Sequence, residues 1–498
     1  MRFAATMSEV PEGLKFPRFE RKEPRPSATL MITRDGQDGV EVLLGLRSES
    51  MPSFPGYWAF PGGGVSRVDA AASESLGISI AECAMFRELV EELGLAPLGN
   101  KLVTVEDDFR MMVVDDKANW FPLALDGDIP CSNDGVRVIS ERTTPPFSPM
   151  RFKNTFLHLH ASEHDEPSLT GQTEFTEVRW IRPRDLITAW KNHVIKVAPP
   201  VVTLLMEVDK CLLRMDENME MVAIDLETRK PGRRSILFAH GVEVVPVRTA
   251  TLPPADHTNC YLVGDPEGEY VLVDPAFHHR EGMEDVAEAV DRHKGELKAI
   301  IFTHSHADHI GDIGLIREAF DVPIWGSKST SEVVECQRII EDGEELILGS
   351  QTWRVIMTHG HCPGHICLIS DAGLVAGDMV AGFGTILVPS NSGDMSLYIS
   401  ELEKLIDLFP HLMFPSHGPV IPLPEQKLED YIYHRKARHQ RVLDAVAKSS
   451  NLEQITKIAY ENTPDAHPGL ALDQTLAHLF SHEKEGSVRR ENDEWVIV

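Results

Sequence analysis

The sequence predicts a multidomain α/β protein that ends in a small helical domain. Its 498 residues are too many for one hydrophobic core, so about two to four domains are expected. Two separate blocks open with strand-like runs, the first with "SATLMITRDG" and "VEVLLGLRS" and the second with "VEVVPVRTA". After Pro424 the apolar residues recur at helical spacing in three stretches, and the chain ends in the hairpin-like "SVRRENDEWVIV".

Five segments are expected from these patterns. Between the two blocks lies "LRMDENMEMVAIDLETRKPGRRS", whose mixed charges predict a linker. Three helices followed by a hairpin are typical of a winged-helix-like domain. The expected segments are an N-terminal arm at 1–24, a first α/β domain at 25–212, a linker at 213–240, a second α/β domain at 241–425 and a winged-helix-like domain at 426–498.

The composition limits the partners of the chain. A net charge of −29, from 77 acidic and 48 basic side chains, repels nucleic acid and anionic membranes. An anionic substrate would need bound cations that reverse the charge locally. No run of about 18 apolar residues is present, so no membrane span is expected. The seven cysteines form no CxxC pair, which favours a reducing, cytoplasmic setting.

The densest group of histidines lies in "IIFTHSHADHIGDIG", directly after an apolar run that predicts a buried strand. The group falls on a strand-to-helix turn, where side chains two positions apart can point to a common site. Imidazoles together with a carboxylate are typical ligands of Zn²⁺. The alternative, an exposed turn of solvated histidines, is less favoured for HxHxDH behind an apolar strand. The group comprises His304, His306, Asp308 and His309.

Further ligands are expected from loops that follow later apolar strands. Glycines near Asp378 allow close backbone approach. The candidates are His359, His361 and His365 in "VIMTHGHCPGHICL", Asp378 in "LVAGDMVAG" and His417 in "LMFPSHGPVI".

This order of motifs resembles the metallo-β-lactamase superfamily over about residues 241–425, which implies an αββα sandwich. "VLVDPAF" is similar to the family's first motif, so Asp274 is expected to orient the metal loop. "THGHCPGH" is similar to the family's TPGHTPGH, which selects His361, although His359 replaces a proline; His365 is expected to pack behind the ligands. The implied ligands are His304, His306 and His361 for one zinc ion, Asp308, His309 and His417 for a second, and Asp378 between both.

The resemblance implies hydrolysis. Both aspartates, Asp308 and Asp378, favour two metals, as in the glyoxalase II-like and RNase-like branches, and exclude the true β-lactamases. Two cations would lower the pKa of a bridging water toward about 7, and the hydroxide would attack an ester, thioester or phosphodiester. Asp308 would orient the nucleophile and shuttle a proton. Iron or manganese binds the same ligand types, so the metal stays open.

The first block contains a second candidate site, in "RELVEELGL" at residues 87–95. On a helix, Glu88, Glu91 and Glu92 share one face, and like charges so close destabilise it unless a cation neutralises them. An ordinary solvated acidic face is the alternative. The glycine loop at 62–64 and Gly94 at the helix end favour a functional site.

"RELVEELGL" resembles the second half of the Nudix box, REUXEEXGU, which implies a Nudix α/β/α sandwich. Glu91 and Glu92 would be ligands of Mg²⁺ or Mn²⁺, Glu88 a further ligand or base, and Arg87 would orient a carboxylate. Counting back places the family's first glutamate at Ser79. An insertion, "DAAASESLGI", explains why a serine stands where the family has a glutamate. A box lengthened in this way resembles the coenzyme A diphosphatase branch of the Nudix family. Glu74 or Asp69 would then supply the missing carboxylate.

Three functional hypotheses follow. The first is a bifunctional hydrolase of a thioester or ester, such as acyl-coenzyme A, and of a diphosphate. The second is a single-strand endoribonuclease joined to a nucleoside-diphosphate hydrolase, because the tail resembles the β-lactamase-like protein 2 group. The third makes the Nudix block a non-catalytic binding module. The basic "HRKARHQR" at 434–441 would meet phosphates of RNA or coenzyme A, or else it is a solvated face or a domain contact. The net charge disfavours long RNA.

Overall fold

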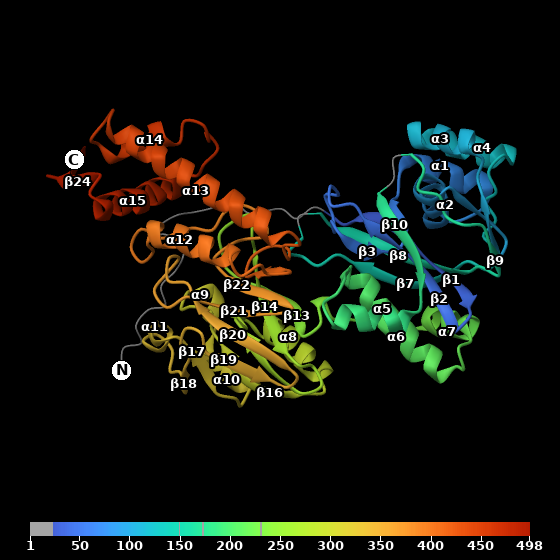
Figure 1. Ribbon diagram of the computed structural model, residues 1–498, viewed down its shortest axis with the longest axis horizontal. Helices are drawn as coiled ribbons and strands as arrows, with labels where there is room; N and C mark the ends of the chain where they lie inside the picture. The colour runs from blue at the N-terminus through green and yellow to red at the C-terminus, as the bar shows by residue number, and fades with distance from the viewer. Residues whose placement is uncertain (1–22, 149, 172–173, 230–231) are drawn as a thin grey trace. The chain divides into compact units, whose positions relative to one another are not determined.

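The computed structural model describes residues 23–148, 150–171, 174–229 and 232–498 (Figure 1). The chain divides after His240 into two compact units, which we call the N-terminal unit and the C-terminal unit. Of the expected N-terminal arm at 1–24, residues 1–22 lie outside the described residues. No helix within the described ranges is long and apolar enough to cross a membrane.

The N-terminal unit is built on a mixed sheet. Its elements are β1 (Arg25–Gly36), β2 (Gly39–Arg47), β3 (Tyr57–Ala59), β4 (Gly62–Gly64), α1 (Arg67–Leu76), α2 (Ile80–Leu93), β5 (Leu95–Leu98), β6 (Lys101–Thr104), α3 (Asp107–Asp115), η1 (Lys117–Asn119), α4 (Trp120–Asp126), β7 (Arg137–Thr143), β8 (Phe152–His160), β9 (Glu163–His164), β10 (Phe175–Ile181), α5 (Pro183–Lys191), β11 (Lys196–Val197), α6 (Pro199–Arg214), α7 (Met219–Thr228) and β12 (Leu237–Ala239). The main sheet has the order β11-β3-β2-β1-β8-β7, with β1 parallel to β8 and antiparallel to β2.

Both faces of this sheet are covered by helices. Successive side chains of a strand point to opposite faces, so Leu30 and Ile32 of β1 pack in one core with α2, and Met31 packs in another core with α6. Figure 1 shows α1 to α4 on one face of the sheet and α5 to α7 on the other. The expected α/β/α sandwich is confirmed.

The segment 213–240 is not the linker that its mixed charges predict. Helix α6 extends to Arg214, and α7 follows almost at once. Met219, Val222 and Leu226 of α7 are buried in the core that contains α6. Residues 219–228 are themselves mostly apolar, and it is the charged residues on either side of them that give the segment its mixed-charge composition.

The C-terminal unit places two sheets face to face. Its first elements are β13 (Val242–Arg248), β14 (His257–Gly264), β15 (Glu269–Val273), α8 (Arg280–Arg292), β16 (Glu296–Ile301), α9 (Ala307–Ile310), α10 (Ile313–Ala319), β17 (Ile324–Gly326), α11 (Lys328–Ser331), β18 (Arg338–Ile339), β19 (Glu345–Leu348), β20 (Gln351–Met357), β21 (Ile366–Ser370), β22 (Gly373–Gly377), α12 (Met395–Ile406) and β23 (Met413–Pro415). One sheet runs β13-β14-β15-β16-β17-β18 within this unit, and the other runs β19-β20-β21-β22-β23.

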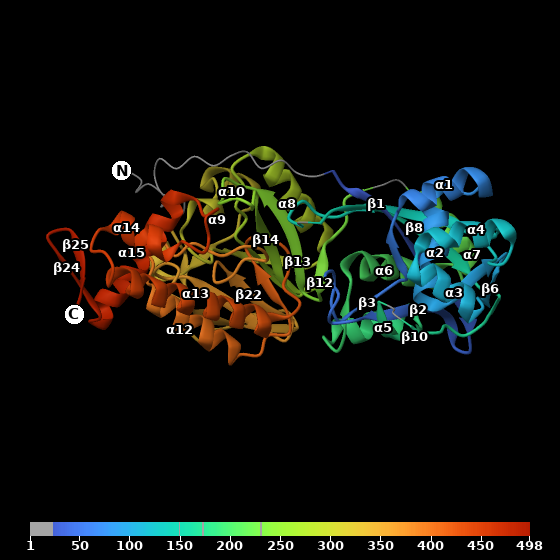
Figure 2. The same cartoon turned by 90° about the horizontal axis from the view of Figure 1, so that it is seen from above.

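Helices cover the outer face of each sheet. The elements that complete the unit are α13 (Pro424–Val446), α14 (Leu452–Ala459), α15 (Pro468–Glu485), β24 (Val488–Glu491) and β25 (Glu494–Ile497). Helices α8 and α10 pack on the first sheet, and α12 and α13 pack on the second, as Figure 2 shows. The expected αββα sandwich is confirmed.

The expected pattern of three helices and a hairpin is present after the second sheet. These helices and the hairpin share a small hydrophobic core, to which Val442, Ile455 and Trp495 contribute. Ala477 of α15, however, packs into the core behind the second sheet. The C-terminal helices therefore belong to the same compact unit as the two sheets, and side chains from α13 and α15 reach the site described next.

Candidate functional site

Loops at the carboxyl ends of several strands converge in the C-terminal unit. Each loop follows a strand whose apolar residues are fixed in a sheet, and the polar residues come directly after it: β16 precedes the histidine-rich turn, and β20, β22 and β23 precede the later candidates. At most 5% of the surface of any of these side chains is exposed. The buried set comprises His304, His306, Asp308, His309, His361, Asp378 and His417.

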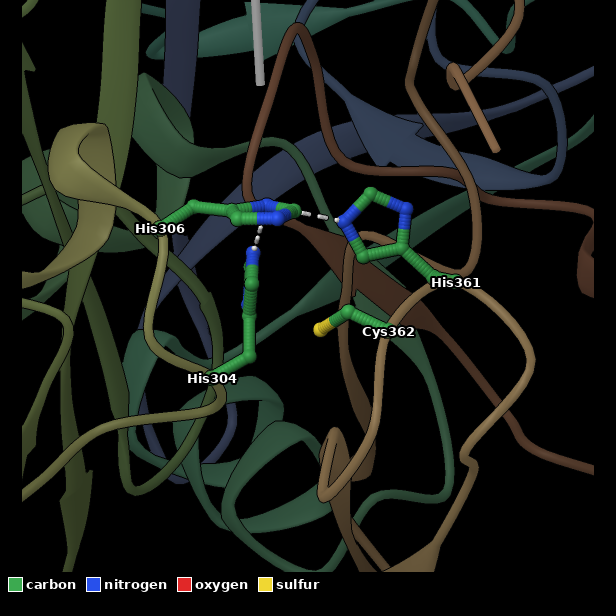
Figure 3. A group of neighbouring side chains, drawn as sticks. All are labelled: His304, His306, His361 and Cys362. Carbon is green, nitrogen blue, oxygen red and sulfur yellow. Dashed lines mark hydrogen bonds between the residues drawn. The ribbon is translucent and has the colours of Figure 1, made fainter. Parts of the chain in front are cut away.

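Three imidazoles form the first group. Nδ1 of His306 lies 2.9 Å from Nε2 of His304 and 3.1 Å from Nε2 of His361. Figure 3 shows the rings of His304 and His361 directed at that of His306, with Cys362 beside them. Burial lowers the pKa of His306 to about 4 and the pKa values of the other two rings well below their usual value. Neutral rings with converging lone pairs are the form that binds a metal ion.

Cys362 was not expected from the sequence. Its sulfur lies within 4.8 Å of the ligand atoms of His304, His306 and His361. The only sequence signal is its position next to His361, and adjacent residues do not usually point the same way.

Two imidazoles and a carboxylate form the second group, of Asp308, His309 and His417. Nε2 of His417 lies 3.6 Å from Oδ2 of Asp308, and Nε2 of His309 lies 4.0 Å from Oδ1 of the same carboxylate. Burial alone would lower the pKa values of both histidines, but the carboxylates of Asp378 and Asp308 outweigh it and raise them. The second group therefore differs from the first in its negative charge.

Asp378 lies between the two groups. Its Oδ2 is 3.5 Å from Nε2 of His309 and 3.8 Å from Nε2 of His361, and its Oδ1 is 3.5 Å from Nε2 of His417. Burial would raise the pKa of this carboxyl, but His417 and His309 hold it well below its usual value. Such distances between donor atoms are too long for hydrogen bonds and match the separation of ligands around one ion.

Several polar atoms here have no hydrogen-bond partner among the described residues. A buried polar atom without a partner is costly, and a cluster of such atoms is typical of a site that binds a cation. The donor set of nitrogens and carboxylate oxygens suits zinc, iron or manganese. The atoms are Oδ2 of Asp308, Nε2 of His309 and both carboxylate oxygens of Asp378.

Surrounding residues hold the imidazoles in place. Nδ1 of His309 lies 2.9 Å from Oδ2 of Asp274, whose two oxygens also accept hydrogen bonds from the backbone and hydroxyl of Thr303. Nδ1 of His361 donates to the carbonyl of Leu387 at 2.9 Å, and Nδ1 of His417 donates to that of His257 at 3.0 Å. In each case the second ring nitrogen is left for the site.

The other two histidines of the "THGHCPGH" stretch do not join the groups. Nε2 of His365 accepts a hydrogen bond of 2.9 Å from the backbone N–H of Asp378, so this ring fixes the backbone of that aspartate. A Cβ atom on Gly377, where φ is +53°, would overlap that ring. Nδ1 of His359 accepts from the backbone N–H of Gly364 at 3.0 Å.

The C-terminal helices reach the loop that holds His361. Arg435 of α13 donates to the carbonyl of Ile386, and Gln474 of α15 donates to that of Val388 at 2.7 Å. Leu387, the acceptor for His361, lies between these two anchored residues. Helices α13 and α15 thus fix a residue that orients one of the three imidazoles.

The second candidate site lies on α2 in the N-terminal unit. Arg87 is buried, and its guanidinium binds Asp69 at two points, Nε to Oδ1 at 2.9 Å and Nη2 to Oδ2 at 3.1 Å. Its Nη1 lies 2.9 Å from both Glu88 and Glu91. Arg87 therefore contacts three carboxylates, and of the two candidates for the missing carboxylate it is Asp69 that lies against it.

Ser79, where the family's spacing would place its first glutamate, has a different role in the structure. Ser79 caps the N-terminus of α2, where its hydroxyl accepts from the backbone N–H of Glu82 at 3.2 Å. Asp69 lies on α1. The rest of "DAAASESLGI" forms the remainder of that helix and the turn that leads toward α2, which carries Arg87. Glu74 is the other candidate for the missing carboxylate, but Arg87 pairs with Asp69 and not with Glu74.

Burial and mutual repulsion raise the pKa values of the helix carboxyls. The pKa of Glu88 rises to about 7 and that of Glu92 rises well above its usual value, chiefly through burial. Glu174, which sequence reasoning missed because it lies far along the chain, adds to both shifts. The backbone N–H of Gly62 donates to Glu92 at 3.0 Å, so the glycine loop contacts this face. Within the described ranges, these glutamates do not belong to any group of three side chains whose ligand atoms lie close enough together to hold one metal ion.

Comparisons with known proteins agree with the two units. The metallo-beta-lactamase superfamily matches residues 253–417, and the NUDIX domain matches residues 23–199. The chain is 30% identical over 256 residues to the beta-lactamase-like protein 2 homolog of Drosophila melanogaster, covering 47% of this chain and 84% of that protein. The Caenorhabditis elegans homolog is 29% identical over 258 residues, covering 48% and 84%. A crystal structure of a NUDIX hydrolase from Alicyclobacillus acidocaldarius aligns with a TM-score of 0.38 at 22% identity, covering 42% of this chain and 100% of that one.

Proposed function

Because this chain belongs to the metallo-β-lactamase superfamily and carries a Nudix domain ahead of it, we propose that it hydrolyses two kinds of bond at two sites. Both are hydrolase families, and the chain is a metal-dependent hydrolase. The C-terminal unit would hydrolyse a thioester or ester such as an acyl-coenzyme A. The N-terminal unit would cleave a diphosphate linkage.

The unpartnered buried atoms of Asp308, His309 and Asp378 carry the proposal for the C-terminal unit. His304, His306 and His361 would hold one zinc ion, and Asp308, His309 and His417 a second, with Asp378 contacting both. Bound cations of this kind act as Lewis acids, which lower the pKa of water and stabilise negative charge on a carbonyl oxygen.

The residues around the centre would perform the remaining tasks. Asp308 is 5% exposed and keeps one oxygen without a partner, so it would orient the attacking water and accept its proton. Asp274 would hold His309 in one tautomer through its bond to Nδ1. His365 would fix Asp378 through the backbone bond described above.

The α2 glutamates carry the proposal for the N-terminal unit. Glu91 and Glu92 would bind Mg²⁺ or Mn²⁺, and Glu88 would serve as a further ligand or as the base. Three neighbouring carboxyls with raised pKa values are a site that a divalent cation would stabilise. Arg87, held by Asp69, would orient Glu88 and Glu91.

A second candidate for the C-terminal unit is single-strand endoribonuclease activity. The observation that favours it is a cleft lined by two basic side chains, Arg435 and Arg438, together with His434 and His417. The cleft holds about 370 Å³, which suits one small group better than a long strand.

Product analysis of the full chain tests the proposal. Acyl-coenzyme A, ADP-ribose and single-stranded RNA would be supplied separately and their products identified by mass spectrometry. His306→Ala should abolish thioester or ester hydrolysis and spare diphosphate cleavage, whereas Glu91→Gln should do the opposite. His279→Ala, at an exposed histidine, is the control and should change neither. Loss of one and the same activity in both variants would contradict two sites, and oligonucleotide products would favour the second candidate.

A further inference from the structure

The cleft in the C-terminal unit has one wall made by the site and another made by the C-terminal helices. The loops at 251–255 and 381–387 and His417 line one side. Helices α13 and α15 and the segment between α14 and α15 line the other, with a volume of about 370 Å³ between them. A group bound in this cleft would therefore lie beside the proposed metal centre.

Two arginines of α13 line this cleft, although they are almost fully buried. Arg435 is 4% exposed and Arg438 is 5% exposed. Arg435 donates to Gln474 at 3.0 Å and to the carbonyl of Ile386, and its Nε has no partner. All of these acceptors are uncharged.

The second guanidinium is held in the same manner. Arg438 donates to the carbonyl of Ala459, to Asn462 at 3.3 Å and to Thr463 at 3.1 Å. Its guanidinium lies over the ring of Tyr460, 3.9 Å from the centroid, which keeps the planar group in one orientation. Again no acceptor carries a charge.

No carboxylate among the described residues pairs with either arginine. This is unusual in a chain with 77 acidic side chains, because a buried charge without a counter-charge is costly. Lys436 of the same helix, which is exposed, pairs with Glu403, and the buried Arg87 pairs with three carboxylates. Arg110 in the N-terminal unit is likewise buried and donates only to backbone carbonyls, but Arg435 and Arg438 are two such guanidiniums on the wall of one cleft.

The neighbouring histidine reports the same positive field. His434 is exposed at the edge of the cleft, and partial desolvation together with the charges of Arg435 and Arg438 lowers its pKa to about 4. His434 is therefore neutral near pH 7 and is available as a hydrogen-bond partner in the cleft wall. The cleft remains positive, although the chain carries a net charge of −29.

We infer that Arg435 and Arg438 form a binding site for a phosphate group of a small-molecule substrate, beside the centre at which that substrate is hydrolysed. This inference rests on the proposed function for the position of the substrate. The N–H donors of two planar guanidiniums match the several oxygens of a phosphate group. A single carboxylate has too few oxygens to accept from all of these donors. The site gives a role to the basic "HRKARHQR" stretch, whose buried members are these two arginines.

Binding to the full chain tests the phosphate site without turnover. Glu91→Gln would be present in every protein, so that binding at α2 contributes little. Coenzyme A, pantetheine, which lacks phosphate, and a single-stranded RNA oligonucleotide would each be titrated by calorimetry. Arg438→Gln should weaken coenzyme A binding about tenfold or more and leave pantetheine binding unchanged. Lys436→Gln, at an exposed neighbour on the same helix, is the matched control and should bind as the parent does.

A second substitution covers the case in which Arg438→Gln does not fold. Arg438→Lys keeps the charge and loses the planar fork, so it should give an intermediate loss of coenzyme A affinity. Equal weakening of coenzyme A and pantetheine, or no weakening of either, would overturn the inference. Weakened binding of RNA alone would also overturn it, because it would assign the site to a polymer. A chain that binds coenzyme A through Arg438 and hydrolyses no ester or thioester would support the site and contradict only the proposed function.

Discussion

Asp274 holds His309 by a buried contact of 2.9 Å between Oδ2 and Nδ1, although neither residue is near the other in sequence. The same carboxylate accepts from the backbone N–H and the hydroxyl of Thr303, which directly precedes the histidine-rich turn. Asp274 therefore joins the loop after β15 to the loop after β16. Its φ of +47° lies in the left-handed region, which aspartate adopts more readily than most residues other than glycine.

Replacing Asp274 should weaken metal binding while the fold is kept. Asp274→Asn keeps the shape and tolerates the positive φ, but it removes the negative charge that stabilises His309. We expect the affinity for the second metal to fall about 10- to 100-fold, measured by competition with a chromogenic chelator. Asp321→Asn, at an exposed site of the same unit, is the control. An unchanged affinity would show that Asp274 does not support the site.

Gly377 should be intolerant of a methyl group because its Cβ would overlap His365. Gly377→Ala should lower the unfolding free energy of the C-terminal unit by about 1–3 kcal/mol beyond the cost of the backbone strain. Gly343→Ala isolates that strain, since Gly343 also has a positive φ, of +76°, and nothing lies within 4 Å of its Cβ position. Hydrogen exchange read by mass spectrometry would report each unit separately. Equal destabilisation by both substitutions would contradict a steric role for His365.

The metal-free N-terminal unit should lose stability as the pH rises. Burial raises the pKa of Glu88 from 4.5 to about 7, so the folded unit binds more protons than the unfolded chain between these values. Stability conferred by the neutral form is present below about pH 4.5 and is lost as the pH rises through about 7. Hydrogen exchange of α2 at a series of pH values in a chelator would measure this.

Glu88→Gln should flatten part of that pH dependence. Glu91 and Glu92 shift in the same direction and would retain the remainder. Added Mg²⁺ should reverse the trend, because a cation stabilises the ionised carboxylates. A metal-free unit that became more stable from about pH 5 to about pH 7 would contradict the raised pKa values.

The candidate centre could be predicted from the sequence because its ligands follow apolar strands in a fixed order. His304, His361, Asp378 and His417 each lie just after a strand, and parallel or neighbouring strand ends meet at one edge. The local pattern of apolar run and polar turn marks the candidates, and the resemblance of their order to the metallo-β-lactamase superfamily groups them into one site. The α/β/α and αββα sandwiches are implied by the resemblance of the motifs to the Nudix and metallo-β-lactamase families, and not by the local pattern itself.

Other features depend on contacts that no local pattern contains. The pairing of Asp69 with Arg87 spans an insertion, so counting along the chain leads to Ser79, which instead caps a helix. Arg435 and Arg438 belong to a basic stretch that looks exposed, because nothing local shows which face of α13 is buried. The helix at 219–228 resembles a linker in sequence because charged residues flank its spaced apolar positions.

The most direct test of the two-metal centre is the metal content of the full chain with Asp378 replaced. Wild-type protein and Asp378→Ala would be dialysed against metal-free buffer and analysed by plasma mass spectrometry. The wild type should retain about two transition-metal ions per chain, and Asp378→Ala should fall below about one, because both groups lose the carboxylate between them. An Asp378→Ala protein that kept both ions, or a wild type that bound none when supplied with zinc, would contradict the account.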